Sequence, residues 1–129
     1  MSKSRQSTAL GSKYHARPVV MDGQAFDSQK EYRRWCELRS LEQAGAIHGL
    51  SRQVKFVLIP AQREPGTTGP RGGRKPGKLL ERERAYYADF VYQRDGETVV
   101  EDVKGVRTDV YKLKKALMLW VHGISITET

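Results

Sequence analysis

The sequence contains 129 residues, 38% of them hydrophobic and 29% charged, which is enough for one domain with a modest core. No apolar stretch reaches the roughly 20 residues that cross a bilayer, and the first residues lack the apolar run of a secretory signal. We therefore expect a cytoplasmic protein without a membrane partner. The single cysteine excludes an intramolecular disulfide framework. The net charge of +8 indicates a polyanionic partner, for which nucleic acid is the first candidate.

Residues 1–18 are polar, lack a hydrophobic period, and carry four cations and no acid. This composition predicts a flexible basic arm. Residues 19–26 predict a short pair of strands that turns at Asp22-Gly23. A helix follows, with Ser28 and Glu31 at the spacing of a capping box, a helical period of apolar residues, and Gly45 as its stop.

Residues 54–59 form a run typical of a strand, which Pro60 ends. The segment 61–84 is rich in glycine and proline and carries seven cations against three acids. Such a composition predicts a flexible basic loop without packed structure. Its charge favours contact with DNA. The candidate DNA-binding residues in it are Arg71, Arg74, Lys75 and Lys78.

Residues 85–93 and 98–104 are rich in aromatic and β-branched side chains, and Asp95-Gly96 between them is a strong hairpin signal. Thr108 is a suitable N-cap for a helix that extends to about Val121. Residues 124–127 alternate as a final strand. The order helix, strand, hairpin, helix, strand predicts an α/β fold, a mixed β-sheet flanked by helices, in one domain over residues 19–129. We expect the apolar side of the last helix to consist of Val110, Leu113, Leu117, Trp120 and Val121.

The hairpin brings two aspartates and a lysine together if its turn has two residues. Such a turn at Asp95-Gly96 places Asp89 opposite Asp102, with Cβ atoms about 5 Å apart. Because side chains alternate along a strand, Lys104 shares a face with Asp102. Two facing carboxylates repel each other unless a hard cation such as Mg²⁺ lies between them. A divalent ion, a positioned water and a nearby lysine are what hydrolysis of a phosphodiester requires.

Each of these residues also has a plain structural explanation. The aspartates could lie at a solvated sheet edge, with Lys104 neutralising them. Both strands are nevertheless apolar on both faces, which is typical of central strands covered by helices. Glu31 could be only a helix cap, yet it precedes Trp35 by four residues and Leu38 by seven, on the side of the helix that faces the core.

Taken together, these residues resemble the PD-(D/E)XK nuclease superfamily. The resemblance rests on Asp89, on Asp102-Val103-Lys104 one hairpin later, and on Glu31 in the preceding helix. A longer set of segments is similar to a small phage- and prophage-borne branch of that superfamily, namely 26–31, 53–56, 88–90, 100–105 and 111–114. The resemblance implies a restriction-endonuclease-like fold, DNA as substrate, Mg²⁺ or Mn²⁺ as cofactor, and the cytosol of a bacterium or phage-infected host.

The resemblance also implies a role for each matching residue. Asp89 matches the first acid of the motif and Asp102 the second, both as metal ligands. Lys104 matches the motif lysine, and Glu31 matches the helix acid that completes the metal shell. Gln53 matches a polar position near the site at the start of the first core strand, where we expect it to contact DNA.

Two features depart from that motif. Ala88 stands where its name has proline, and Asp102 replaces the commoner glutamate. The adjacent Glu101 is an alternative second acid if the hairpin contains a bulge. Alternation along the strand favours Asp102, because only Asp102 shares a face with Lys104.

On the last helix, Tyr111 and Lys115 lie one turn apart near the strand that carries Lys104, and both are candidate DNA-binding residues. Three functions are compatible with the sequence: a Mg²⁺-dependent endonuclease, a nuclease-like DNA-binding module that does not cut, and a basic assembly protein. The opposed acids favour the endonuclease. The short chain favours structure-selective cutting of junctions or branches, and the resemblance to phage-borne nucleases implies a role in phage DNA recombination. Coordinated cutting of two strands would require a homodimer.

Overall fold

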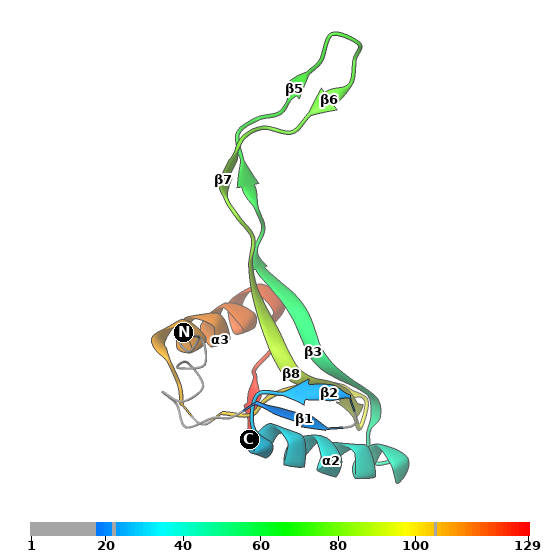
Figure 1. The fold of residues 1–129 in the computed structure, drawn as a ribbon. Helices are drawn as coiled ribbons and strands as arrows, with labels where there is room; N and C mark the ends of the chain where they lie inside the picture. Colours follow the sequence, from blue (N-terminus) through cyan, green and yellow to red (C-terminus); the bar gives the residue numbers. More distant parts are fainter. Residues whose placement is uncertain (1–17, 22, 105) are drawn as a thin grey trace.

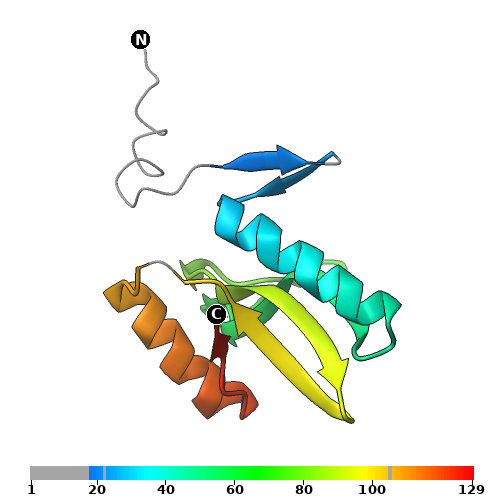
Figure 2. The same cartoon turned by 90° about the horizontal axis from the view of Figure 1, so that it is seen from below.

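The computed structural model describes residues 18–21, 23–104 and 106–129 of the chain. At its centre is a mixed sheet of four strands in the order β10-β9-β8-β3. Two helices, α2 (Gln29–Gln43) and α3 (Asp109–His122), lie on opposite sides of this sheet (Figure 1, Figure 2). The predicted α/β fold, a mixed sheet flanked by helices, is confirmed. The predicted basic arm lies, up to residue 17, outside the described residues.

The central hairpin has the predicted register. Asp95 and Gly96 have φ values of 52° and 79°, as a two-residue turn of the primed type requires. The paired residues run from Arg94 opposite Glu97 to Phe90 opposite Glu101. Neighbouring strands are antiparallel except for β9 and β10, which are parallel. The four strands are β3 (His48–Ile59), β8 (Arg84–Arg94), β9 (Glu97–Asp102) and β10 (Thr127–Glu128).

Strand β9 ends at Asp102, two residues earlier than the sequence predicts. The backbone amide of Val103 donates to the Asp89 carboxylate at 2.8 Å, and the amide of Lys104 donates to the Thr129 carbonyl at 3.1 Å. Both amides have therefore found other acceptors, so the ladder with β8 does not continue. The Asp89 side chain thus binds the backbone of the first residue after β9.

Strand β3 begins at His48, six residues before the predicted start. Its first half is polar and contains Gly49 and Gln53 with positive φ angles of 66° and 50°, so it has no strand pattern of its own. Pairing with β8 holds it in the sheet, with Ser51 opposite Val91. Tertiary pairing overrides weak local preference here.

The ends of both helices agree with the sequence. The Ser28 hydroxyl accepts from the Glu31 amide at 3.2 Å and caps α2, and Thr108 caps α3 in the same way. The short hairpin of β1 (Val19–Met21) and β2 (Gln24–Phe26) precedes α2 as predicted. No helix in the described part of the chain is long and apolar enough to cross a membrane.

Two hydrophobic clusters hold the helices against the sheet, and burial of each large side chain in them stabilises the fold by about 1.5–3 kcal/mol. Trp35 of α2 stacks on Phe90 of β8 with ring centroids 6.1 Å apart. The cluster on the α2 side consists of Leu38, Ile47, Phe90 and Tyr92. The cluster on the α3 side consists of Leu58, Tyr86, Ala88, Val100, Tyr111, Met118 and Ile126.

The predicted apolar side of α3 is wrong. Val110, Leu113 and Trp120 are 63%, 62% and 84% exposed, and Val121 is exposed as well, while Leu117 is half-buried. The helix buries Tyr111 and Met118 instead. The Tyr111 hydroxyl donates to Glu128 of β10 at 2.7 Å, a long-range bond that selects this face and that the helical period alone does not reveal.

The basic segment between β3 and β8 differs from the predicted loop, because its two halves pair. Gln62 lies opposite Glu81 and Thr67 opposite Lys75, and the Glu64 amide donates to the Lys78 carbonyl at 2.9 Å. We call residues 61–83 the ribbon. Its strands are β4 (Gln62–Arg63), β5 (Thr67–Thr68), β6 (Arg74–Lys75) and β7 (Leu79–Glu81). Figure 1 shows the ribbon projecting from the body as a continuation of β3 and β8.

Candidate active site

A pocket of about 360 Å³ lies where the first turns of α2 and α3 meet the sheet. Both helices begin at this pocket, so the positive ends of two helix dipoles favour an anion there. The pocket brings together six of the residues singled out from the sequence, which are Glu31, Gln53, Asp89, Asp102, Lys104 and Tyr111.

Glu31 enters the pocket from the first turn of α2 and is only 2% exposed. One carboxylate oxygen accepts from the Asp27 backbone amide at 2.8 Å, and the other accepts from the Gln53 side chain at 3.2 Å. Arg52 places a guanidinium nitrogen 3.6 Å from the second oxygen. Glu31 therefore bonds the backbone at the helix start and also lines the pocket.

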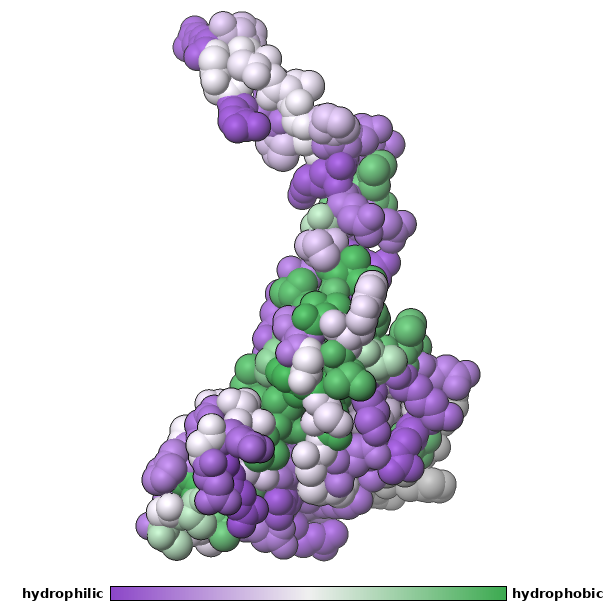
Figure 3. All heavy atoms as spheres, turned by 180° about the vertical axis from the view of Figure 1, so that it is seen from behind, coloured by the Kyte–Doolittle hydropathy of each residue, from purple (hydrophilic) through white to green (hydrophobic). Residues whose placement is uncertain are grey.

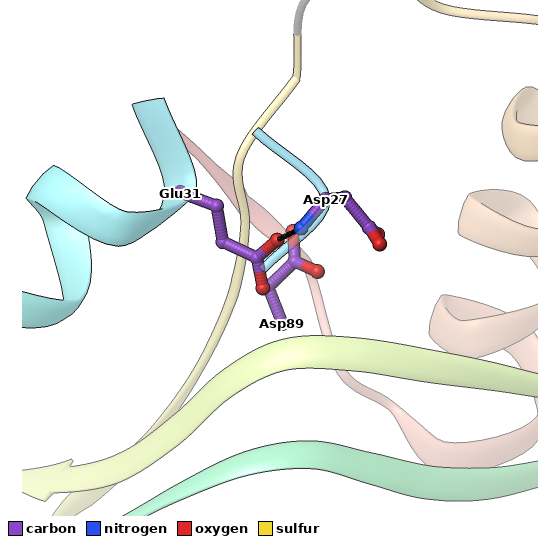
Figure 4. Close-up of side chains that lie close together, drawn as sticks. All are labelled: Asp27, Glu31 and Asp89. Carbon is purple, nitrogen blue, oxygen red and sulfur yellow. Dashed lines mark hydrogen bonds between the residues drawn. The ribbon is translucent and has the colours of Figure 1, made fainter. Parts of the chain in front are cut away.

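Asp89 lies in β8 and is 9% exposed. One of its oxygens accepts from the Gln53 side-chain amide at 3.1 Å, and the other accepts from the Val103 backbone amide. The same Gln53 nitrogen thus bridges Glu31 and Asp89. Figure 4 shows the two carboxylates side by side, one from α2 and one from β8.

Asp102 ends β9 and is 3% exposed. One carboxylate oxygen accepts from the Tyr86 hydroxyl at 2.7 Å and lies 3.3 Å from the Lys104 ammonium. That ammonium sits 4.1 Å from the centre of the Tyr111 ring, a cation–π contact that restricts its position. Asp102 and Lys104 thus lie together, as predicted, although Lys104 follows the end of β9 and strand alternation does not place it there.

Glu101, the alternative second acid, points away from the pocket. It is fully buried and accepts two bonds from the Arg34 guanidinium, at 2.6 and 2.9 Å. The Tyr92 hydroxyl donates to it at 2.7 Å. Of these two neighbouring acids, Asp102 lines the pocket and Glu101 does not.

Burial governs the electrostatics of the pocket. Removal from water raises the pKa of Asp89, and its hydrogen bond with Asp102 and the negative charge of Asp102 raise it further. Burial likewise raises the pKa of Glu31, against the opposing effect of the Asp27 amide. In both cases the ionised form lacks enough compensating positive charge.

Asp27 completes a group of acids that the sequence analysis missed. Asp27, Glu31 and Asp89 each offer a carboxylate oxygen, and the three oxygens lie within 4.8 Å of one another. Asp27 also lines the pocket and is exposed. Its place just before the cap of α2 was the available signal, because residues that flank a capping site lie beside the acid in the first turn.

Tyr86 and Arg52 were missed for a different reason. Tyr86 is an aromatic residue of a strand, and the bond from its hydroxyl to Asp102 is long-range. Arg52 lies 3.9 Å from the centre of the Phe26 ring and donates to the Ala25 carbonyl at 2.7 Å, so it ties the β1–β2 hairpin to the site. Neither contact has a signature in local sequence.

The remaining predicted DNA-binding residues lie outside the pocket. Lys115 donates to Glu128 at 3.2 Å, so it contributes to the anchoring of α3. The other four are exposed side chains of the ribbon, namely Arg71, Arg74, Lys75 and Lys78. The structure therefore separates the acids of the pocket from the cations of the ribbon.

Comparison with known proteins gives one family. A family model described as "Protein of unknown function (DUF1064)" matches residues 11–122. Neither the curated proteins nor the solved structures contain a significant match.

Proposed function

The chain belongs to this DUF1064 family, and from its pocket we propose that it is a divalent-metal-dependent nuclease of the PD-(D/E)XK type that hydrolyses phosphodiester bonds in DNA. One observation carries the proposal: buried carboxylates from three separate elements, Glu31, Asp89 and Asp102, converge in one pocket beside Lys104. Burial of several acids together costs stability unless charge compensates them. A fold that retains such a cluster is consistent with use of those acids in binding or catalysis.

The donors of the pocket fit a hard divalent cation. Asp27, Glu31 and Asp89 already place oxygens within 4.8 Å of one another, and Asp102 lies close enough to Asp89 to raise its pKa. The described residues that line the pocket include no cysteine or histidine, so its chemistry suits Mg²⁺ or Mn²⁺. When bound, such an ion supplies Lewis-acid polarisation of a phosphate and lowers the pKa of a coordinated water.

The other residues of the pocket then act on the substrate or on the acids. Lys104 is held between Asp102 and the Tyr111 ring, where its charge can stabilise negative charge that develops on the phosphate. Gln53 bridges Glu31 and Asp89 and fixes their separation. Tyr86 orients Asp102 through its hydroxyl. The N-termini of α2 and α3 add a positive potential for the phosphate group.

The proposal is tested with linear duplex, single-stranded and branched DNA in the presence of Mg²⁺, Mn²⁺ or EDTA. We expect cleavage that requires the metal. Asp102→Asn should reduce the cleavage rate by about a hundredfold to a thousandfold, because an interaction with the reacting centre is lost, while DNA binding stays within about twofold. Asp95→Asn is the matched control: Asp95 lies in the hairpin turn with φ 52°, which asparagine adopts readily, so cleavage should be unchanged.

Two results would contradict the proposal. Cleavage that persists in Asp102→Asn would place the chemistry elsewhere. Binding without cleavage of any substrate would favour the alternative function, a nuclease-like DNA-binding module that does not cut. The same assay addresses the narrower parts of the proposal, since a preference for branched DNA would support structure-selective cutting in phage DNA recombination, and paired nicks would support a homodimer.

A further inference from the structure

The net charge of the protein is confined to two segments. Residues 1–18 and residues 65–78 each carry four cations and no acid. The remaining 15 cations and 15 acids balance, so the rest of the chain is neutral. Residues 65–78 form the outer half of the ribbon, and we call them the ribbon tip. Of these eight cations, the four that the structure describes lie in the ribbon tip, apart from the pocket.

The cations of the ribbon tip are exposed on both faces of a two-stranded structure. Arg74 and Lys75 are consecutive residues of β6, so their side chains project to opposite faces. Their partners in β5 are Thr68 and Thr67, which add short polar side chains without negative charge. A ribbon that lay flat on one strand of phosphates would need its cations on one face only.

The ribbon is narrow because glycine permits a close approach of its two halves. A Cβ atom at Gly77 would overlap the backbone carbonyl of Glu64, and a Cβ atom at Gly66 would lie 2.8 Å from the Lys75 carbonyl. Gly66 and Gly77 therefore allow the two halves to pair closely. Figure 3 shows hydrophilic and near-neutral surface at its free end, with hydrophobic surface nearer the body.

The dimensions of the ribbon suit a groove of duplex DNA. About ten residues of each half lie beyond the sheet, which at about 3.3 Å per residue allows a reach of up to about 30 Å. The major groove of B-DNA is about 12 Å wide and admits a two-stranded β-ribbon, with phosphates along both of its walls. Cations on both faces of the ribbon match those two walls.

We propose that the ribbon tip enters the major groove of B-form duplex DNA, so that the substrate of the pocket carries a duplex arm beside the reacting phosphate. This inference rests on the proposed function for its choice of polyanion. It excludes single-stranded DNA, which has no groove, and duplex RNA, whose major groove is too deep and narrow to enter. The contacts are with phosphates, so the ribbon supplies affinity and orientation without sequence preference.

The charge of the tip is tested by binding of 20-base-pair duplex DNA, single-stranded DNA and duplex RNA in EDTA, where no cleavage is needed. The variant replaces Arg71, Arg74, Lys75 and Lys78 with Gln. We expect at least a tenfold loss of affinity for duplex DNA. The slope of log K against log[salt] should also become shallower by about 3 to 4, since each lost phosphate contact contributes about 0.9 to that slope. The matched control removes the same charge from the body by replacing Arg33, Arg39, Arg94 and Lys112 with Gln.

The shape of the ribbon is tested without any change in charge. Gly77→Ala should push the two halves apart, whereas Gly73→Ala should not, because a Cβ atom at Gly73 meets nothing within 4 Å. Guanine N7 lies in the major groove, so wild type and Gly73→Ala should protect it from methylation by dimethyl sulfate, and Gly77→Ala should lose that protection.

Several results would overturn the inference. It fails if the two charge variants lose equal affinity for duplex DNA, or if the wild type binds duplex RNA as tightly as duplex DNA. It also fails if adenine N3 in the minor groove is protected in place of guanine N7. The two proposals also fail separately. If the protein cuts DNA with metal but the ribbon variants bind DNA as the wild type does, only the proposal for the ribbon is rejected. If binding depends on the ribbon but no DNA is cut, only the proposed nuclease activity is rejected.

Discussion

Strand β9 buries one carboxylate on each of its faces, and the two are held in opposite ways. Glu101, on the α2 side, accepts from two guanidinium nitrogens of Arg34, Nε and Nη2, and from the Tyr92 hydroxyl. Asp102, on the pocket side, meets the Tyr86 hydroxyl and one lysine, and lies beside a second acid, Asp89. Both acids are buried, so burial alone does not distinguish the pocket. The pocket differs in that its buried acids have less compensating positive charge around them.

Removal of Glu101 should have the largest effect on stability. Glu101→Leu removes the buried partner of Arg34, which keeps only its ion pair with the exposed Glu37 among those of the described residues, and loss of one member of a buried ion pair costs about 3–5 kcal/mol. The free energy of unfolding, measured in urea, should fall by that amount. Cleavage per folded molecule should change less than tenfold, because Glu101 does not line the pocket.

The double variant Arg34→Met/Glu101→Leu serves as its control. Removal of both charges should recover much of the lost stability, since no unpaired charge stays buried. If Glu101→Leu abolished cleavage in a protein that still unfolds cooperatively, the division of roles between the two faces of β9 would be wrong.

Lys104→Met removes the only ammonium group that contacts Asp102 in the described part of the chain. We expect the cleavage rate to fall by about a hundredfold to a thousandfold, the usual consequence of losing a group that stabilises transition-state charge. Duplex binding in EDTA should change by less than about threefold. Lys112→Met, an exposed lysine of α3, should leave both quantities unchanged, and an equal loss there would show that only overall charge matters.

The placement of Glu101 and Asp102 on opposite faces of β9 was accessible from the sequence because it depends on local rules. The Asp95-Gly96 turn fixes the register of the hairpin, and alternation along β9 then separates Glu101 from Asp102. The capping position of Glu31 is likewise a local pattern. Fold class and the placement of Glu31, Asp89 and Asp102 follow from turns, caps and periodicity, whereas Lys104 lies beyond the end of β9.

What the sequence could not predict depends on contacts between distant segments. The buried face of α3 is selected by the bond from Tyr111 to Glu128, and the pairing within the ribbon by hydrogen bonds across its two halves. The polar first half of β3 is a strand only because β8 pairs with it. Asp27 and Tyr86 reach the pocket through the same tertiary placement.

Tyr86→Phe tests the support of Asp102 with a smaller change. The substitution removes the hydroxyl that donates to Asp102 at 2.7 Å and keeps the ring in the core. Loss of a partner that orients a metal-binding carboxylate typically costs about tenfold to a hundredfold in metal affinity or activity. We expect that loss in Mn²⁺ affinity by calorimetry. Tyr92→Phe, which removes the matching hydroxyl from Glu101, should leave Mn²⁺ affinity unchanged.

The smallest effect concerns pH. The pKa of Asp89 is raised on folding, chiefly by burial, so the folded protein holds this proton at a pH where the unfolded chain has lost it. In metal-free protein the corresponding stability is present below the usual aspartate pKa of about 4 and is lost as the pH rises toward the folded pKa. Asp89→Asn imitates the protonated acid and should therefore melt a few degrees higher than wild type at pH 8 in EDTA.

Bound Mn²⁺ should reverse the order of the two melting temperatures, so that wild type melts above Asp89→Asn. Mn²⁺ at a hundred times its dissociation constant stabilises a folded protein by about 2.7 kcal/mol, and Asp89→Asn should gain little of this because a ligand is missing. Melting curves at pH 5 and pH 8, with EDTA and with Mn²⁺, measure both effects. If wild type were the more stable protein at pH 8 in EDTA, Asp89 would already have its compensating charge within the protein, as Glu101 does, and the contrast between the two sides of β9 would not hold.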